Sequence, residues 1–317
     1  MKRIRLLVGM AIAAVCMTTV AAFADDLDTI RQQPAIKKSY SFRSLPPDAG
    51  KGIIVALIDS GLTRELKDLL GDRVTAVSVR KDESGISDGI GTGTFDLSLI
   101  AALAPQAALI SIKVLDDEGN AGYEEIRNGI IRATELKANI IVLPLGAPPD
   151  EEDNGVNAAI GNALAKGILI LASAGNDSGG PISYPSTLKN VVAIGCSNEK
   201  DELAYFSSHD KKMLCAPGDK VIGVSLEKNV DMAGRMLIAH SGTSMAAGVA
   251  GGIFAVLWSQ APDLTSQQLI DIVTSSAIMI SGDWHGGDGE ISRHAPVKRI
   301  DGQAALLKCV SRGRTSK

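Results

Sequence analysis

Short apolar runs alternate with longer stretches of helical periodicity along much of this 317-residue chain. The short runs predict buried strands, and the longer stretches predict helices. Because strands that alternate with helices build right-handed βαβ units, we predict an α/β fold with a doubly wound parallel sheet and helices on both faces. The predicted buried strands are Ile53–Ile58, Ala108–Val114, Asn139–Leu143, Ile168–Ala172 and Val191–Ile194, and the predicted helices are Phe95–Leu103, Tyr123–Lys137 and Val156–Lys166.

The last third of the chain adds an Ala/Gly-rich helix, Ser244–Trp258, and a further helix capped by Thr265 with Gln268 three residues on. No internal repeat or second-domain boundary is visible, and 45% hydrophobic with 21% charged residues excludes a disordered chain. We therefore expect one domain over residues 51–308, with a short N-terminal tail and linker at 25–50 and a C-terminal tail at 309–317.

Residues 1–24 have the pattern of a cleaved signal peptide. The apolar stretch is about 15 residues long, shorter than the roughly 20 that a membrane-spanning helix needs. We therefore expect an exported protein, periplasmic or secreted, with no stable membrane span after cleavage. The pattern consists of the cations Lys2, Arg3 and Arg5, the apolar stretch Leu6–Val20, and the small-x-small site Ala22-Phe23-Ala24.

Net charge and cysteine content limit which partners, metals and cofactors we expect. The formal net charge is −4, with no Lys/Arg run, so we expect no nucleic-acid partner. Cys196, Cys215 and Cys309 follow the predicted leader, and disulfides are possible in an exported protein. No CxxC motif and no Cys/His cluster is present, so we expect no metal site and no cofactor.

Three motifs carry candidate chemistry. Asp59 ends the first predicted strand and precedes a Gly turn, where open α/β sheets place their sites. Asn176 follows Ala174-Gly175 after a later strand, and its side-chain amide can donate to an oxyanion. Ser244 opens the Ala-rich helix, whose free N–H groups can stabilise negative charge. Taken singly, each motif also fits a structural turn or a helix cap.

The three motifs, in this order, resemble the subtilisin-like serine proteases, the subtilase or S8 family. The resemblance implies a subtilisin-like fold with Asp59 as the triad acid, Ser244 as the nucleophile and Asn176 as the oxyanion donor. It runs from about Gly52 to Leu307 and includes further short matches at Lys113-Val114-Leu115-Asp116, Gly119–Tyr123, Tyr184-Pro185, Val191–Gly195, Phe206-Ser207-Ser208, Ala216-Pro217-Gly218, Ser241–Ala246 and Arg299–Ala305.

The family's histidine has no counterpart here. Where the family has His-Gly-Thr-His, this chain has Ile90 and Gly93 in place of the two histidines. The chain's histidines, His209, His240, His285 and His294, all follow Asn176 in the sequence.

Two more positions depart from the family's pattern. The Ser of the family's Ser-Leu-Gly is Pro144 here, and the Pro four residues after the nucleophile is Gly248. Ser Oγ is a poor nucleophile without a base.

The resemblance and its missing base together predict a pseudoprotease that binds a peptide or protein ligand in the old cleft. One alternative is an active endopeptidase that uses His240 or a histidine of its substrate. Another is a structural or assembly protein. In the resembled fold Cys196 and Cys215 lie on neighbouring strands, so we expect them close in space, either bridged or as two buried thiols. The substrate-binding positions implied are Gly119, Gly122, Pro144, Leu145, Gly146 and His240.

Overall fold

The structure is a computed structural model that describes residues 25–81, 85–224, 237–285, 291–292 and 294–315. The predicted signal peptide therefore lies outside the described residues. Within the described part, no helix is long and apolar enough to cross a membrane.

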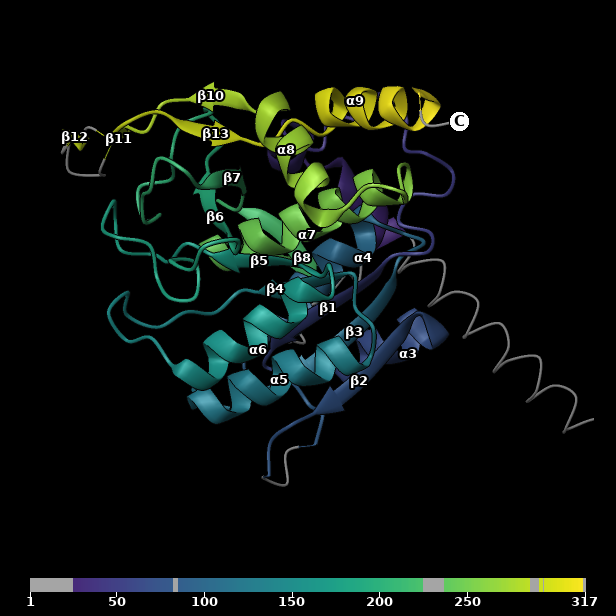
Figure 1. Cartoon of the computed structure of the whole chain (residues 1–317), viewed down its shortest axis with the longest axis vertical. Coiled ribbons are helices and arrows are strands. Elements are labelled where there is room, and N and C mark those ends of the chain that lie inside the picture. The colour runs from purple at the N-terminus through teal and green to yellow at the C-terminus, as the bar shows by residue number, and fades with distance from the viewer. Residues whose placement is uncertain (1–24, 82–84, 225–236, 286–290, 293, 316–317) are drawn as a thin grey trace, which may run out of the picture.

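A largely parallel sheet forms the centre of the molecule (Figure 1). Neighbouring strands run parallel, except that β10 at one edge is antiparallel to β13. This arrangement confirms the predicted fold class. Across the sheet, the described strands are β10 (Ile278–Ile280), β13 (Val297–Arg299), β7 (Leu214–Pro217), β6 (Val192–Ser197), β5 (Leu169–Ser173), β4 (Ile140–Leu143), β1 (Ile54–Asp59), β3 (Ala108–Lys113) and β2 (Val74–Ser78).

Helices cover both faces of the sheet, as the alternating pattern predicts. On one face α5 (Tyr123–Glu135) and α6 (Asn154–Ala165) lie side by side (Figure 1). On the other face α4 (Thr92–Leu103) packs against α7 (Thr243–Ser259). The smaller elements are α2 (Pro34–Lys37), α3 (Arg64–Leu70), a 3₁₀ turn (Gly71–Arg73), α8 (Ser266–Ser276), α9 (Gly302–Thr315) and the two-stranded pairs β8 (Val221–Val224) with β9 (Leu237–His240) and β11 (Trp284–His285) with β12 (Ile291–Ser292).

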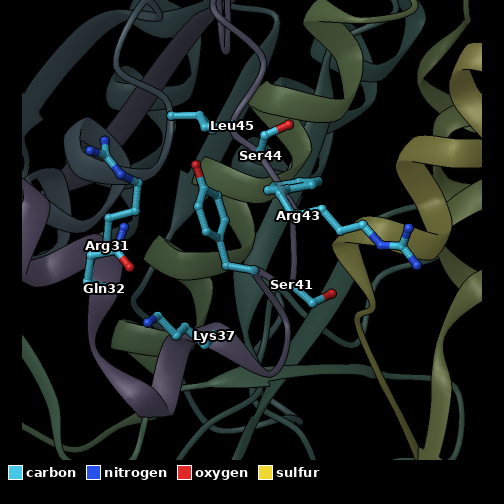
Figure 2. Close-up of a pocket in the computed structure, with 9 residues that line it drawn as sticks. Arg31, Gln32, Lys37, Ser41, Arg43, Ser44 and Leu45 are labelled. Carbon is cyan, nitrogen blue, oxygen red and sulfur yellow. The ribbon is translucent and has the colours of Figure 1, made fainter.

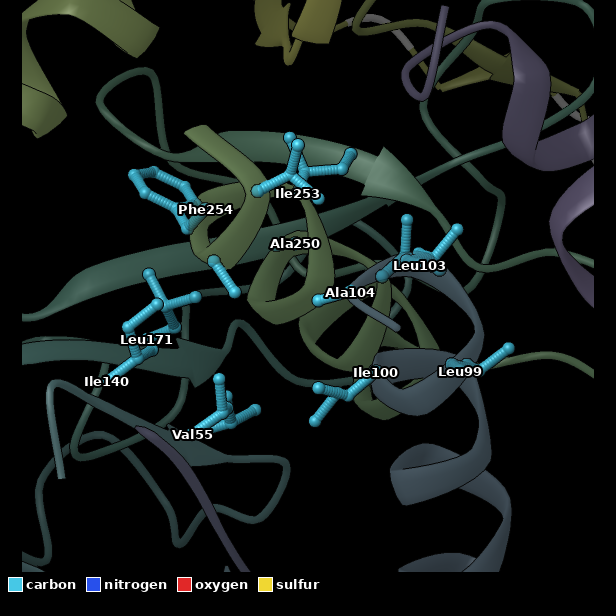
Figure 3. Close-up of a cluster of buried hydrophobic side chains, with 14 of the residues drawn as sticks. Val55, Leu99, Ile100, Leu103, Ala104, Ile140, Leu171, Ala250, Ile253 and Phe254 are labelled. Atoms are coloured by element: carbon cyan, nitrogen blue, oxygen red, sulfur yellow. The ribbon is translucent and has the colours of Figure 1, made fainter. Parts of the chain in front are cut away.

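The helix α7 forms the centre of the larger apolar core, between the sheet and α4 (Figure 3). It is buried on nearly all sides, which explains why it is apolar around its whole circumference. Small residues allow this close packing. A Cβ at Gly251 would lie 2.8 Å from a methyl of Val142, and one at Gly252 would lie 2.6 Å from Cβ of Leu103. The Ala/Gly composition of α7 therefore sets how closely it approaches its neighbours.

The segment expected as an N-terminal tail and linker packs into the domain instead. Ile30 and Ile36 are fully buried. The Gln33 side chain pairs with the backbone of β8, donating to Ile222 O at 2.9 Å and accepting from Ile222 N at 2.7 Å. The Tyr40 hydroxyl donates to Leu103 O at the end of α4. Apolar residues within this polar stretch gave too weak a pattern to predict the docking.

The C-terminal tail expected from residue 309 also differs from the structure. Helix α9 continues to Thr315, and Cys309 is buried on its inner side. Because Cys309 behaves as a small apolar side chain, it extends the buried face of the helix.

The cysteines of β6 and β7 lie close together on adjacent strands, as expected, but they are not bridged. In the parallel register Cys196 is paired with Ala216, and Cys215 is paired with Gly195. A one-residue offset places two side chains on opposite faces of a sheet. Both thiols are buried and free, so the expected bridge is wrong and the alternative of two buried thiols is correct.

Candidate active site

The candidate residues converge on one edge of the sheet. Strand β1 ends at Asp59, and the neighbouring strand β4 is followed directly by Pro144. The next strand, β5, leads three residues later to Asn176. Ser244 lies in the first turn of α7 and hydrogen-bonds to Pro144. The carboxyl ends of adjacent parallel strands form a common edge, where open α/β sheets place their sites.

The Ser244 hydroxyl is bonded to a backbone carbonyl. Its Oγ donates to Pro144 O at 2.7 Å, and the residue is half-buried. Among the described residues this is the hydrogen bond that Ser244 Oγ makes. A carbonyl oxygen is not a general base, so this bond does not itself activate the hydroxyl as a nucleophile.

Asn176 is fixed with its amide nitrogen free. Its Oδ1 accepts from the backbone N–H of Thr243 at 3.0 Å and from Thr243 Oγ1 at 3.1 Å. Thr243 Oγ1 in turn accepts from Gly175 N at 3.2 Å, which ties the loop to the start of α7. Within the described part of the chain, Nδ2 of Asn176 donates to no protein group, and the residue is exposed. This donor is available to a ligand oxygen beside Ser244.

Asp59 is almost completely buried and is bonded to hydroxyl and amide donors. Its Oδ1 accepts from Ser60 N at 2.5 Å and from Thr92 Oγ1 at 2.7 Å. Burial raises the pKa of Asp59 to about 6, although these hydrogen bonds oppose the shift, and the nearby Asp88 carboxylate adds to it. The triad acid implied by the resemblance is therefore bonded to Thr92, with no imidazole as its partner in the described residues.

The loop before α4 is organised by Asp88, which the sequence analysis missed. Its Oδ1 accepts from Ser60 Oγ at 2.8 Å and Gly91 N at 2.7 Å, and its Oδ2 accepts from Thr94 N at 2.8 Å. These contacts satisfy amides at the start of α4. The sequence feature that could have identified Asp88 is its place directly before the Gly-rich start of a helix.

The two positions that the resemblance matches to the family's histidines differ in the space around them. A Cβ at Gly93 would lie 2.4 Å from Gly61 O, so no side chain fits there. Ile90 is partly exposed, and its Cδ1 lies 3.5 Å from the Cβ position of Gly119. Ile90 therefore faces the segment expected to bind substrate. It brings an apolar surface and no proton acceptor.

A second unpredicted acid lies one turn into α4. Asp96 is fully buried, and neither carboxylate oxygen has a hydrogen-bond partner among the described residues. Burial raises the pKa of Asp96 well above its usual range, and the charges of Asp59 and Asp88 add to the shift. Gly248 packs directly against this residue, because a Cβ there would lie 3.3 Å from Asp96 O and 3.5 Å from Asp96 Cβ. The sequence feature that could have identified Asp96 is an acidic residue inside an otherwise apolar helix.

The expected substrate-binding segments are exposed near this edge. Gly119, Gly122 and Gly146 are solvent-exposed, Leu145 is half-buried and Pro144 is buried. Gly119 lies in the left-handed region at φ +87°, in a turn closed by Asp116 N donating to Asn120 O at 2.8 Å. These positions leave backbone groups accessible to an extended ligand.

His240 is placed by packing on an aromatic ring. It is exposed at the end of β9, and its ring lies edge-on to Phe95 with centroids 5.0 Å apart. No hydrogen bond joins it to Ser244 or Asp59 within the described residues. Two further histidines, His209 and His294, lie close together, with ring centroids 4.9 Å apart and ring planes tilted by 32°. Within the described residues, no group of three or more His, Cys, Asp and Glu side chains is arranged to hold a metal ion.

Comparison with known proteins places the chain among serine proteases. The model of the Subtilase family matches residues 50–304. The Major intracellular serine protease of Bacillus subtilis (strain 168) is 34% identical over 230 residues, covering 66% of this chain and 69% of that protein. Subtilisin E of the same organism is 31% identical over 260 residues, 78% of this chain and 66% of that protein. Subtilisin of Bacillus pumilus is 31% identical, with 78% of this chain and 91% of that protein covered.

Proposed function

The chain belongs to the subtilase family, and from this premise we propose that it is an exported pseudoprotease that binds a peptide or protein segment without cleaving it. The observation that carries the proposal is the bond from Ser244 Oγ to Pro144 O. The sequence supports it, because the resemblance matches Ile90 to the position of the base. The predicted leader at residues 1–24 supports export to the periplasm or the medium.

The size of the expected loss in kcat follows from the role of the base in acyl transfer. In subtilisin, removing the base lowers kcat by about 10⁶-fold, which corresponds to roughly 8 kcal/mol. The oxyanion donors and the binding groove alone leave a rate only about 10³–10⁴ above that in water. The Asn176 amide nitrogen is still free to donate to a ligand oxygen. In this proposal the protein therefore still binds its ligand, although it does not cleave it.

Binding of an extended segment would use the exposed backbone at the cleft. A peptide that adds as a strand needs donors and acceptors on both neighbouring segments. The segment around Gly119 and Gly122 supplies exposed backbone groups. On the other side Pro144 has no N–H, so one donor is lost and the bound register is shorter. The affinity is correspondingly weaker than for a complete groove.

Calorimetry with extended peptides and active-site labelling test the proposal together. Extended peptides should bind saturably, while a serine-directed fluorophosphonate should leave Ser244 unlabelled, because the probe needs an activated hydroxyl. Ser244→Ala should bind the same peptides. Rapid labelling, or folded protein that binds no extended peptide, would reject the proposal.

An active enzyme that uses His240 is the competing function, and it has a distinct signature. His240→Ala would then abolish an activity that Ile90→Ala leaves intact. The ring contact of His240 with Phe95, and the absence of a hydrogen bond to Ser244 among the described residues, favour the inactive form.

A further inference from the structure

A cavity of about 530 Å³ lies on the N-terminal segment (Figure 2). One continuous stretch of the chain surrounds it. Arg31, Gln32 and Lys37 line one side, and Ser41, Arg43 and Ser44 line the other (Figure 2). Three of the nine lining residues are cationic and none is acidic. This volume is typical of small-molecule sites.

Two of the cations are not neutralised by the protein. In the described residues, the Lys37 ammonium and the Arg43 guanidinium make no ion pair and no hydrogen bond, and both residues are exposed. Arg31 differs, because it pairs with Asp28 and donates to Ala102 O at 3.1 Å. The two free charged groups lie on opposite sides of the pocket, with the Lys37 ammonium on the side of Gln32 and the Arg43 guanidinium pointing away from it (Figure 2), and Arg31 is already bound to its own partners.

Aromatic rings supply an apolar wall. Tyr40 and Phe42 pack edge to face with ring centroids 4.7 Å apart and an interplanar angle of 82°. Tyr40 is buried and its hydroxyl donates to Leu103 O, so its ring is already fixed before any ligand arrives. Burial also raises the pKa of Tyr40, which keeps the phenol neutral. Leu45 adds aliphatic surface to the lining.

We propose that this pocket binds an amphipathic organic anion, a phosphate or carboxylate group attached to an apolar body. The free cations attract the anionic group, and guanidinium and ammonium donors bind such groups through charge-assisted hydrogen bonds. The fixed rings contact the apolar body with little loss of conformational entropy. An anionic lipid headgroup and a free aryl or alkyl phosphate share this chemistry.

The pocket is separate from the cleft. Tyr40 is bonded at Leu103, the last residue of α4, whereas Thr92 at the first residue of the helix contacts Asp59. A twelve-residue helix spans roughly 18 Å. Binding in the pocket is therefore measurable whether or not the cleft binds peptide.

Calorimetry of the full chain with phenyl phosphate as the probe tests the proposal. We expect saturable 1:1 binding with Kd of about 1 mM or below, and weaker binding of inorganic phosphate, which lacks the apolar body. Lys37→Gln and Arg43→Gln should each weaken phenyl phosphate binding about 10-fold. The matched control is Lys166→Gln, an exposed lysine at the end of α6, which should leave binding unchanged.

An experiment with lipid vesicles distinguishes a lipid headgroup from a free small molecule as the source of the anion. Co-sedimentation with phosphatidylcholine vesicles containing phosphatidylglycerol, lost in the double variant Lys37→Gln/Arg43→Gln, would assign a lipid headgroup. Phenyl phosphate binding without co-sedimentation would assign a free small molecule. The proposal is overturned if phenyl phosphate gives no saturable heat, if inorganic phosphate binds equally well, or if the folded double variant binds phenyl phosphate like the parent.

Discussion

Replacing Asp96 with asparagine should stabilise this protein, and the gain should grow as the pH rises. Asp96 is fully buried with both oxygens unpartnered, beside the carboxyl groups of Asp59 and Asp88. Its pKa in the folded state is raised by burial first and by those two charges second. Asparagine has nearly the same shape and no charge, so Asp96→Asn removes the ionisation and leaves the packing.

The magnitude follows from proton linkage. A folded-state pKa above the unfolded value means that the native protein keeps a proton which the unfolded chain has released. Stability is then greatest below the unfolded pKa of about 3.9, and falls by up to about 1.4 kcal/mol per pH unit as the pH rises toward the folded pKa. Over each pH unit between the unfolded and the folded pKa, the variant should gain up to about 1.4 kcal/mol over the parent.

Urea unfolding followed by far-UV circular dichroism, from pH 4 to pH 8, measures this difference. The pKa of Asp59, raised to about 6, gives a slope of the same sign in both proteins, so the difference between the two curves isolates Asp96 together with its coupling to Asp59. Asp68→Asn is the matched control, since that side chain is 69% exposed, and it should show no pH-dependent gain. Parallel stability curves for the parent and Asp96→Asn would refute the reasoning.

Three shorter predictions concern the sheet and the site. Cys196 and Cys215 should both be alkylated in unfolded, unreduced protein, and a mass spectrum showing them bridged would contradict the register of β6 and β7. Phe95→Ala should lower the free energy of unfolding by about 3–5 kcal/mol in urea titrations, because the ring is 2% exposed and packs on β8, and a loss under 1 kcal/mol would contradict that packing. Ile90→His should restore little Ser244-dependent cleavage of a fluorogenic peptide, since a triad needs its geometry held within about 0.5 Å, and rates near those of an active subtilase would show that the geometry is intact.

The strand and helix pattern was readable because buried parallel strands are continuous apolar runs. The five predicted strands and the helices between them correspond to β1, β3, β4, β5 and β6 with α4, α5 and α6, shifted by a few residues at their ends. The capping box of Thr265 and Gln268 was equally local, and both of its hydrogen bonds are present. Short edge strands such as β2 and β10 lacked a sufficiently long apolar run.

Parts of the site depended on tertiary contacts that no local pattern encodes. The bond from Ser244 to Pro144 joins residues 100 positions apart, and the docking of Gln33 on Ile222 joins residues 189 apart. Asp96 was read as part of an apolar helix, because burial of an acid without partners is visible only once its neighbours are placed. The assignment of Ile90 to the base position comes from the sequence alone and stays a prediction, since it depends on matching Ile90-Gly91-Thr92-Gly93 to the family's His-Gly-Thr-His.

Proteolysis that depends on Ser244 tests the central claim most directly. Casein is incubated at neutral pH with the purified protein and with Ser244→Ala, and released peptides are measured over time. With Ser244 Oγ bonded to Pro144 O and Ile90 in place of the base, we expect the two proteins to give the same background. Robust cleavage by the parent that Ser244→Ala abolishes would contradict the pseudoprotease and establish an active enzyme.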